Sequence, residues 1–397
     1  MAPLLSIEEA LERILARARP LDAERVAVAD AGGRVLAENV TASVDLPPFA
    51  SSAMDGYAVR AEDTPGRLPV VFRIAAGRPA ARPLGAGEAM AIATGGAVPE
   101  GADAVVPIEV VAETENTLDV PEAAETGAHV RPAGGDVRAG DVVLAAGTTV
   151  GAAQVGALAA AGAGEVIVSR RPQVVVLSTG TELRAPGETL GAGQIYEANG
   201  AMLAAAFATA GALVERLGPV ADDEAEHRRA LERGLEADVL VSSGGVSVGP
   251  HDLVRRILAE LGVQEEFWGV AVRPGKPLAF GSRGRTLVFG LPGNPVSSLV
   301  AVELFVRPAL LALQGATDPR PRYELARLAT SLRRNPARDE LVRARSSRDD
   351  AGTVLEPLSG QESHMIVRAA GANALVHVPA GEGELAAGEP ARYLRLG

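Results

Sequence analysis

The sequence predicts a multi-domain α/β protein with a central doubly wound domain, on the basis of three observations. Apolar strands and helices alternate regularly from about residue 173 to 313, which is typical of a doubly wound parallel sheet. Residues 26–147 instead carry short Val-rich runs between Gly and Pro turns, which indicates irregular, mostly β structure. Residues 323–397 lack long helical periodicity and favour a small β barrel or sandwich. At about 100–200 residues per domain, the 397 residues correspond to about two to four domains.

The individual elements follow from capping and periodicity. A first helix begins at the capping box formed by Ser6 and Glu9, repeats apolar residues at helical spacing and ends before Pro20. The stretch 315–322 is rich in Pro and charge and is expected to be a linker. The other predicted strands are 68–75, 104–111, 141–145, 165–168, 173–177, 213–217, 238–242, 266–270 and 286–289. The other predicted helices are 152–161, 199–210, 223–235, 253–261 and 295–313.

Composition argues against several classes of function. The net charge of −12 disfavours nucleic-acid binding, because that affinity depends on neutralising phosphates with basic residues. The absence of cysteine excludes disulfides, zinc–thiolate sites, iron–sulfur clusters and cysteine nucleophiles. Acidic residues near the N-terminus argue against a signal peptide. The sequence contains no run of about 18 apolar residues, so no membrane span is expected. We therefore expect a cytoplasmic protein with neither a nucleic-acid nor a membrane partner.

Three unusual loops follow predicted strands of the central sheet: STGTEL at 178–183, SSGGVSVGPHD at 242–252 and GLPGNP at 290–295. Ligands of open α/β sheets bind at the carboxyl ends of the strands, and glycines let backbone N–H groups approach an anion. In the third loop, Asn294 and Pro295 suit the N-cap and first position of a helix, whose N-terminus favours negative charge. Each loop alone could be only a tight turn, but three together favour a phosphate-bearing ligand. The candidate binding residues in them are Ser178, Thr179, Gly180, Ser243, Gly244, Gly245, Ser247, Pro292, Gly293, Asn294 and Pro295.

Charged loop residues suggest the rest of a site. Arg273 and Lys276 flank a Pro-Gly turn and could bind an oxyanion, although a solvated hairpin tip explains them equally well. Acidic side chains in loops suit Mg²⁺, which prefers oxygen ligands and bridges phosphates, although an Asp beside Gly is usually a turn residue. No histidines have metal-ligand spacing, and His227 on a charged helix is expected to be solvated. The acidic candidates are Asp55, Asp136, Glu182, Asp222 and Asp252, of which Asp222 could instead cap the helix at 223–235.

Several of these strings together resemble the MoeA family of molybdopterin molybdenumtransferases, which is related to the E domain of gephyrin. The resemblance runs from about residue 5 to the C-terminus. It rests on SAMDGYAVR, TGG, STGTEL, GQIYEAN, SSGGVSVG, PGKPLAFG and GLPGNPVSSLV. Two departures are Ala50-Ser51, where the family often has Asp-Asn, and Arg273, where many members have Lys. The second departure keeps the positive charge but alters its hydrogen-bond geometry.

The resemblance implies a four-domain homodimer that inserts molybdenum from molybdate into adenylylated molybdopterin, with Mg²⁺, and releases AMP. The implied partners include other cofactor-synthesis proteins and apo-molybdoenzymes. The implied domains are 1–40 with 141–169, a β-rich insertion at 41–140, a MogA-like domain at 170–316 and a β barrel at 317–397. Because the N-terminal candidates lie far in sequence from the sheet, we expect a cleft between domains, across a dimer interface.

The resemblance also implies roles for individual residues. Glu182, Asp222 and Asp252 would arrange Mg²⁺ and water, whereas Thr94, Arg273 and Lys276 would receive molybdate or phosphate. The glycine turns would hold the pterin and the adenylate. Transferred by matching motifs, the catalytic positions are Asp55, Thr94, Asp136, Glu182, Asp222, Asp252 and Lys276, with Ser363 as a binding residue of the C-terminal domain.

Two alternatives stay open. One is a MogA-like adenylyltransferase, which would make the adenylylated intermediate, but the N-terminal motifs and the C-terminal β domain disfavour it. The other is a non-catalytic scaffold, which the presence of the loop acids and Lys276 disfavours.

Overall fold

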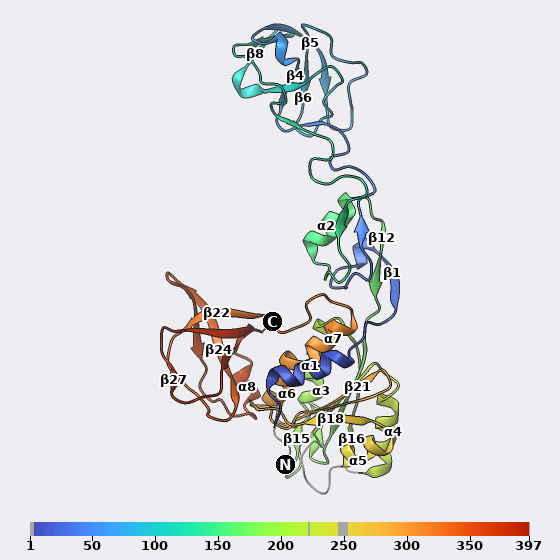
Figure 1. Cartoon of the computed structure of the whole chain (residues 1–397), viewed down its shortest axis with the longest axis vertical. Coiled ribbons are helices and arrows are strands. Elements are labelled where there is room, and N and C mark those ends of the chain that lie inside the picture. The colour runs from blue at the N-terminus through green and yellow to red at the C-terminus, as the bar shows by residue number, and fades with distance from the viewer. Residues whose placement is uncertain (1–3, 221–222, 245–252, 397) are drawn as a thin grey trace.

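The computed structural model describes residues 4–220, 223–244 and 253–396. The chain is elongated, with a β-rich domain at one end, a small domain around α2 in the middle, and a central α/β domain beside a β barrel at the other end (Figure 1). The multi-domain α/β class with a β-rich N-terminal part is therefore confirmed.

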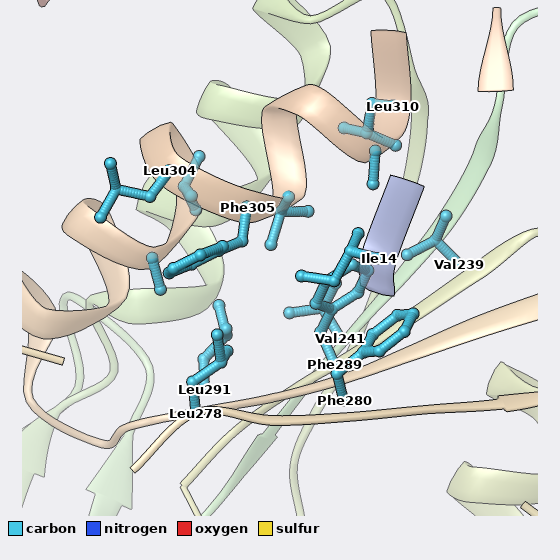
Figure 2. Close-up of a cluster of buried hydrophobic side chains, with 14 of the residues drawn as sticks. Ile14, Val239, Val241, Leu278, Phe280, Phe289, Leu291, Leu304, Phe305 and Leu310 are labelled. Carbon is cyan, nitrogen blue, oxygen red and sulfur yellow. The ribbon is translucent and has the colours of Figure 1, made fainter. Parts of the chain in front are cut away.

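The N-terminal helix α1 (Ile7–Arg17) packs onto the central domain rather than onto its neighbours in sequence. The Ser6 hydroxyl accepts from Glu9 N at 3.2 Å and Glu9 accepts from Ser6 N at 2.8 Å, so the predicted capping box is present. The buried residue Ile14 joins the core of the central sheet (Figure 2). The chain then leaves through β1 (Ala23–Ala27), which pairs antiparallel with β12 (Glu165–Ser169) to form the middle domain with α2 (Ala152–Ala160).

The β-rich domain is a six-stranded sheet of order β7-β4-β6-β5-β9-β8. Its strands are β4 (Gly56–Val59), β5 (Gly66–Ile74), β6 (Ala89–Ile92), β7 (Ala104–Pro107), β8 (Ala112–Thr114) and β9 (Thr117–Val120). The strand expected at 104–111 ends early because a 3-10 turn, Ile108–Val110, follows it. Two short pairings form the neck that joins this domain to the middle one. They are β3 (Ser51–Ser52) with β10 (Val130–Arg131), and β2 (Val40–Thr41) with β11 (Val142–Leu144).

The central sheet has the order β16-β13-β17-β21-β20-β18. Its strands are β13 (Gln173–Thr179), β16 (Leu213–Val220), β17 (Val239–Ser243), β18 (Gln264–Trp268), β20 (Ala279–Arg283) and β21 (Thr286–Leu291). The first four in spatial order are parallel, as predicted, but β20 runs antiparallel to both β21 and β18. Only Gly284 and Arg285 separate β20 from β21, and so short a connection permits only an antiparallel pair. The expectation of a wholly parallel sheet was wrong at this edge.

Helices cover both faces of this sheet. Val174, Val176 and Val241 face α1, α3 (Asn199–Thr209) and the helical segment 295–313, while Val175 and Leu177 face α4 (Glu224–Gly234) and α5 (Leu253–Glu260). This alternation is the period of two expected of strands that are buried on both sides. Figure 2 shows the first of these cores, in which Phe280 and Phe289 from the sheet lie beneath Phe305 and Leu310.

The long apolar helix predicted at 295–313 contains a π-helical interruption. It consists of α6 (Pro295–Ala301), the π-helical stretch Val302–Val306 and α7 (Arg307–Leu313). Pro308 has no N–H and would clash with a carbonyl in a regular helix, so the π stretch before it relieves both problems. By length and composition this helix could cross a membrane, but 72% of its most apolar window is buried. It is the core helix of the central domain.

The C-terminal domain is a closed barrel, which decides between the two β architectures expected. Its strands close in the order β24-β25-β22-β28-β26 and back to β24. They are β22 (Tyr323–Leu328), β24 (Asp339–Asp349), β25 (Gly352–Pro357), β26 (Ala374–Val378) and β28 (Pro390–Arg395). A short strand of the central domain, β19 (Val272–Arg273), pairs with β24, and buried barrel leucines join the central core. The barrel is therefore docked firmly on the central domain.

Candidate functional site

A cleft of about 510 Å³ opens at the carboxyl ends of β13 and β17, beside the start of α6. This is the edge of the sheet at which the sequence predicted a ligand. Of the candidate residues, the cleft is lined by Ser178, Thr179, Gly180, Glu182, Ser243, Gly244, Gly293, Asn294 and Pro295. Gly245, Ser247, Asp222 and Asp252 lie outside the described residues.

The loop after β13 needs glycine at Gly180. This residue has a φ of +152°, and a Cβ added there would lie 2.7 Å from the nearer carboxylate oxygen of Glu182. The Glu182 carboxylate is therefore folded back over the backbone of its own loop and exposed at the cleft. A carboxylate held in this position could bind a cation, and the cation would bridge the carboxylate to a phosphate.

The helix start at the GLPGNP loop is as expected. Pro295 occupies the first turn of α6 and Asn294 is its N-cap, although the Asn294 side chain makes no capping bond. Pro292 lies just outside the cleft lining, and its carbonyl accepts from the Ser298 hydroxyl at 2.6 Å. Pro295 has no N–H and Val296 N is bonded to the Ser363 carbonyl, so the start of α6 favours negative charge near Gly293 through the helix dipole.

The barrel contributes one wall of the cleft, which the sequence had only partly indicated. The carbonyl of Ser363 accepts from Val296 N at 3.1 Å, which holds the barrel loop against α6. The next residue, His364, and Ile366 of α8 (Ile366–Ala369) line the cleft.

A buried arginine supports this barrel loop. Arg343 on β24 is 2% exposed, and its guanidinium donates to the carbonyls of Gly360, Glu362 and Met365 at 2.8, 3.3 and 3.3 Å. Burial lowers the pKa of this side chain. Sequence reasoning missed Arg343, because a strand arginine in a charged segment reads as an exposed residue.

Two polar residues at the start of α3 were also missed. Glu197 is 3% exposed and accepts from Gly200 N at 2.6 Å and from the Ser178 hydroxyl at 3.1 Å, while Arg216 pairs with its other oxygen at 3.2 Å. Asn199 Nδ2 donates to Ser243 Oγ at 2.7 Å and to the Gly293 carbonyl at 2.8 Å. The string GQIYEAN contained both residues, but nothing in their spacing assigns them a bond partner.

The expectation that His227 is solvated was wrong. His227 is 1% exposed, lines the cleft, and has Nδ1 2.9 Å from the Asp223 carbonyl oxygen. It lies four residues before Leu231, so both side chains are on the face of α4 that packs on the sheet. The cap of this helix is Asp223, whose carboxylate accepts from Glu226 N at 2.8 Å, rather than Asp222.

The two candidate cations are not part of the cleft lining. Arg273 Nη1 pairs with Glu340 Oε1 of β24 at 2.8 Å, which directs its side chain toward the barrel. Lys276 lies three residues on, half-buried, beyond the Pro-Gly turn. Neither belongs to the described residues that border the cleft.

The N-terminal candidates form a second group, in and beside the β-rich domain. Asp55 accepts from Thr94 N at 2.6 Å and from the Thr94 hydroxyl at 2.8 Å, and these bonds hold the pKa of Asp55 below its usual value. Asp136 is exposed at the neck, where its N–H donates to the Leu46 carbonyl at 2.8 Å. Figure 1 shows this region well separated from the central domain within one chain.

The metal-binding expectation involves one described residue, Glu182. Over residues 4–220, 223–244 and 253–396, no group of three or more His, Asp or Glu side chains is arranged to hold a metal. The cleft does supply one exposed carboxylate, that of Glu182, together with the hydroxyls of Ser178, Thr179 and Ser243. Such oxygen donors fit Mg²⁺, which keeps part of its water shell and shares phosphate oxygens with a substrate.

Three family models together match nearly the whole chain. The MoeA N-terminal region (domain I and II) matches residues 5–162, and the MoeA C-terminal region (domain IV) matches 325–396. Between them, a model described as a probable molybdopterin binding domain matches 175–312.

Whole-chain relatives agree with these models. A protein named molybdopterin molybdenumtransferase 2 from Mycobacterium tuberculosis is 40% identical over 376 residues, 91% of this chain and 92% of its own. Molybdopterin molybdenumtransferase of Haemophilus influenzae is 34% identical over 393 residues, 97% of each chain. A crystal structure of a molybdopterin biosynthesis moeA protein from Pyrococcus horikoshii superposes with a TM-score of 0.85 at 28% identity, covering 99% of this chain and 100% of that one.

Proposed function

We propose that this chain, which belongs to the MoeA family, transfers molybdenum from molybdate into adenylylated molybdopterin and releases AMP. The observation that carries the proposal is the cleft at the carboxyl ends of β13 and β17, where hydroxyls, a carboxylate and the start of a helix converge. A phosphate, a molybdate and a polar heterocycle each find suitable partners among these groups.

The cleft residues would bind and orient the substrate. The backbone N–H groups of the turn Gly293-Asn294 and the Ser243 hydroxyl can donate to phosphate or molybdate oxygens. The substrate brings its own dithiolene sulfurs, so a protein without cysteine can still assemble a molybdenum–sulfur centre. These donors would be held in place before the substrate binds. They would therefore stabilise the negative charge that develops as the phosphate bond breaks.

Mg²⁺ belongs to the proposal as a cofactor. Glu182 would hold it, with Asp222 and Asp252 as further candidate ligands outside the described residues. When bound, the ion would supply Lewis-acid polarisation of the substrate phosphate.

A homodimer would bring the second group of acids to the cleft. Asp55, Thr94 and Asp136 do not reach the cleft of their own chain, so they can take part only at the cleft of a partner chain. Large apolar side chains are exposed next to them: Phe49 is 47% exposed and Met54 is 38% exposed. Burial of such residues against a partner is a driving force for association.

A cytoplasmic location is the remaining part of the proposal. The dithiolene substrate is oxidation-sensitive, and the cytoplasm keeps thiols reduced. There the product would pass to an apo-molybdoenzyme, and the adenylylated substrate would come from the preceding adenylyltransferase.

The test is a defined reaction of the purified chain with adenylylated molybdopterin, molybdate and Mg²⁺. We expect AMP release that depends on molybdate, and a product that activates an apo-molybdoenzyme. Molybdopterin with ATP, offered in a parallel reaction, should yield no adenylylated product. AMP release without molybdate, or adenylylation of molybdopterin, would contradict the proposal.

A further inference from the structure

Two serine hydroxyls lie side by side at the floor of the cleft. Ser178, the last residue but one of β13, lies next to Ser243 of β17, and the two residues are register partners in the parallel pair. They are 4% and 3% exposed and both border the cleft. Each hydroxyl has one described side-chain partner, and these two partners differ in chemistry.

Ser178 is bonded to an obligatory acceptor. The Glu197 carboxylate lies 3.1 Å from Ser178 Oγ and can only accept, so the serine must use its hydrogen on this bond. The carboxylate is itself held by Gly200 N at 2.6 Å and by Arg216 at 3.2 Å. A Cβ on Gly200 would lie 2.9 Å from both Ser178 Oγ and Glu197 Oε2, so a larger residue there would displace these side chains. Only the oxygen lone pairs of Ser178 are left for a ligand.

Ser243 is bonded to an obligatory donor. Asn199 Nδ2 lies 2.7 Å from Ser243 Oγ and 2.8 Å from the Gly293 carbonyl oxygen. A backbone carbonyl only accepts, which fixes the amide nitrogen of Asn199 on this side and makes it the donor to Ser243 as well. The Ser243 hydroxyl hydrogen is left for a ligand.

We propose that these neighbouring hydroxyls present opposite hydrogen-bonding character to one bound substrate. Ser178 accepts from an N–H group on the edge of a heterocyclic ring, and Ser243 donates to an oxyanion. Glu197 and Asn199 are the positioning residues that set this difference. The inference rests on the proposed function, because an adenylylated pterin carries both kinds of group, on its pterin or adenine ring and on its phosphates.

The test measures how tightly separate fragments of such a substrate bind to the full-length chain. The probes are 6-hydroxymethylpterin, adenosine and inorganic phosphate, each titrated by ligand-observed NMR. Ser178→Ala should lower the affinity for the heterocycle about fivefold, because one hydrogen bond is lost, and should leave the affinity for phosphate unchanged. Ser243→Ala should lower the affinity for phosphate by a similar factor and leave the affinity for the heterocycle unchanged. The heterocycle that responds to Ser178→Ala identifies the ring that lies against it.

Two further variants separate polarity from packing. Glu197→Met keeps a side chain of similar size but removes the acceptor, so the Ser178 hydrogen is released and heterocycle affinity should fall while Ser178 remains. Ser347→Ala removes an exposed hydroxyl from β24 in the barrel and should change no affinity. Fluorescence of Trp268, the single tryptophan, reports whether each variant keeps the central domain folded.

Several outcomes overturn the inference. These are an equal loss of both probe classes in each serine variant, the reverse pattern, or no binding of any probe to the unaltered chain. The binding test is separate from turnover: the crossed pattern without molybdenum transfer would refute only the proposed function. Transfer without the crossed pattern would refute only the inference.

Discussion

Asn199→Ala should loosen the cleft by removing the clamp between two of its walls. The side chain of Asn199 links Ser243 at the end of β17 to Gly293 before α6, through bonds of 2.7 and 2.8 Å. A hydrogen bond contributes about 1 kcal/mol net, and one of these two is solvent-exposed, so the central domain should lose about 1–2 kcal/mol of unfolding free energy.

Urea unfolding followed by tryptophan fluorescence measures this loss. Trp268 is the only tryptophan and lies on β18 of the same sheet, so its signal follows the central domain. The matched control is Thr64→Ala in the β-rich domain. It also removes two bonds of one side chain, to the Ala61 carbonyl at 2.7 Å and from Ala124 N at 2.8 Å. A loss below about 0.5 kcal/mol for Asn199→Ala, or an equal shift for Thr64→Ala, would refute the clamp.

Two further predictions concern pH. The backbone N–H and then the hydroxyl of Thr94 lower the pKa of Asp55, so Thr94→Val should raise that pKa while leaving it below its usual value; a carboxyl NMR titration showing no change would contradict this. Hydrogen bonds from Arg395 and then Tyr393 lower the pKa of Glu324 to about 2. Because that pKa is depressed, the stabilisation of the barrel is present above the ordinary value of 4.5 and is lost as pH falls toward about 2. Glu324→Gln should remove this pH dependence from acid unfolding of the barrel, and an unchanged acid transition would be inconsistent with it.

The sequence predicted most of the central domain because its strands are buried on both faces. Continuous apolar runs such as 173–177 and the capping box at Ser6 have few other structural solutions. The antiparallel strand β20 was missed because its approach through Pro and Gly resembles a loop. His227 was misjudged because its helix is mostly charged, and only the packing of α4 shows which face is covered.

The candidate site was predictable as a place but not as a set of bonds. Glycine-rich loops at strand ends marked the cleft, since topology brings parallel strand ends together. The bond of Glu197 to Ser178 joins residues 19 positions apart and that of Asn199 to Gly293 joins residues 94 apart, and no local pattern encodes such contacts. In the proposed dimer, Asp55 and Thr94 would come from a partner chain, and an arrangement of that kind cannot be deduced from the fold of one chain.

The most direct test of the central claim, a molybdenum-transfer site built from two chains, is complementation between two inactive variants. Asp55→Ala removes a carboxylate from the β-rich wall and Glu182→Ala removes one from the cleft, and each alone should abolish molybdate-dependent AMP release. In a symmetric dimer, a mixed pair keeps one intact site of two, so an equal mixture after subunit exchange should recover about a quarter of the unaltered activity. A mixture no more active than either variant would contradict the two-chain site.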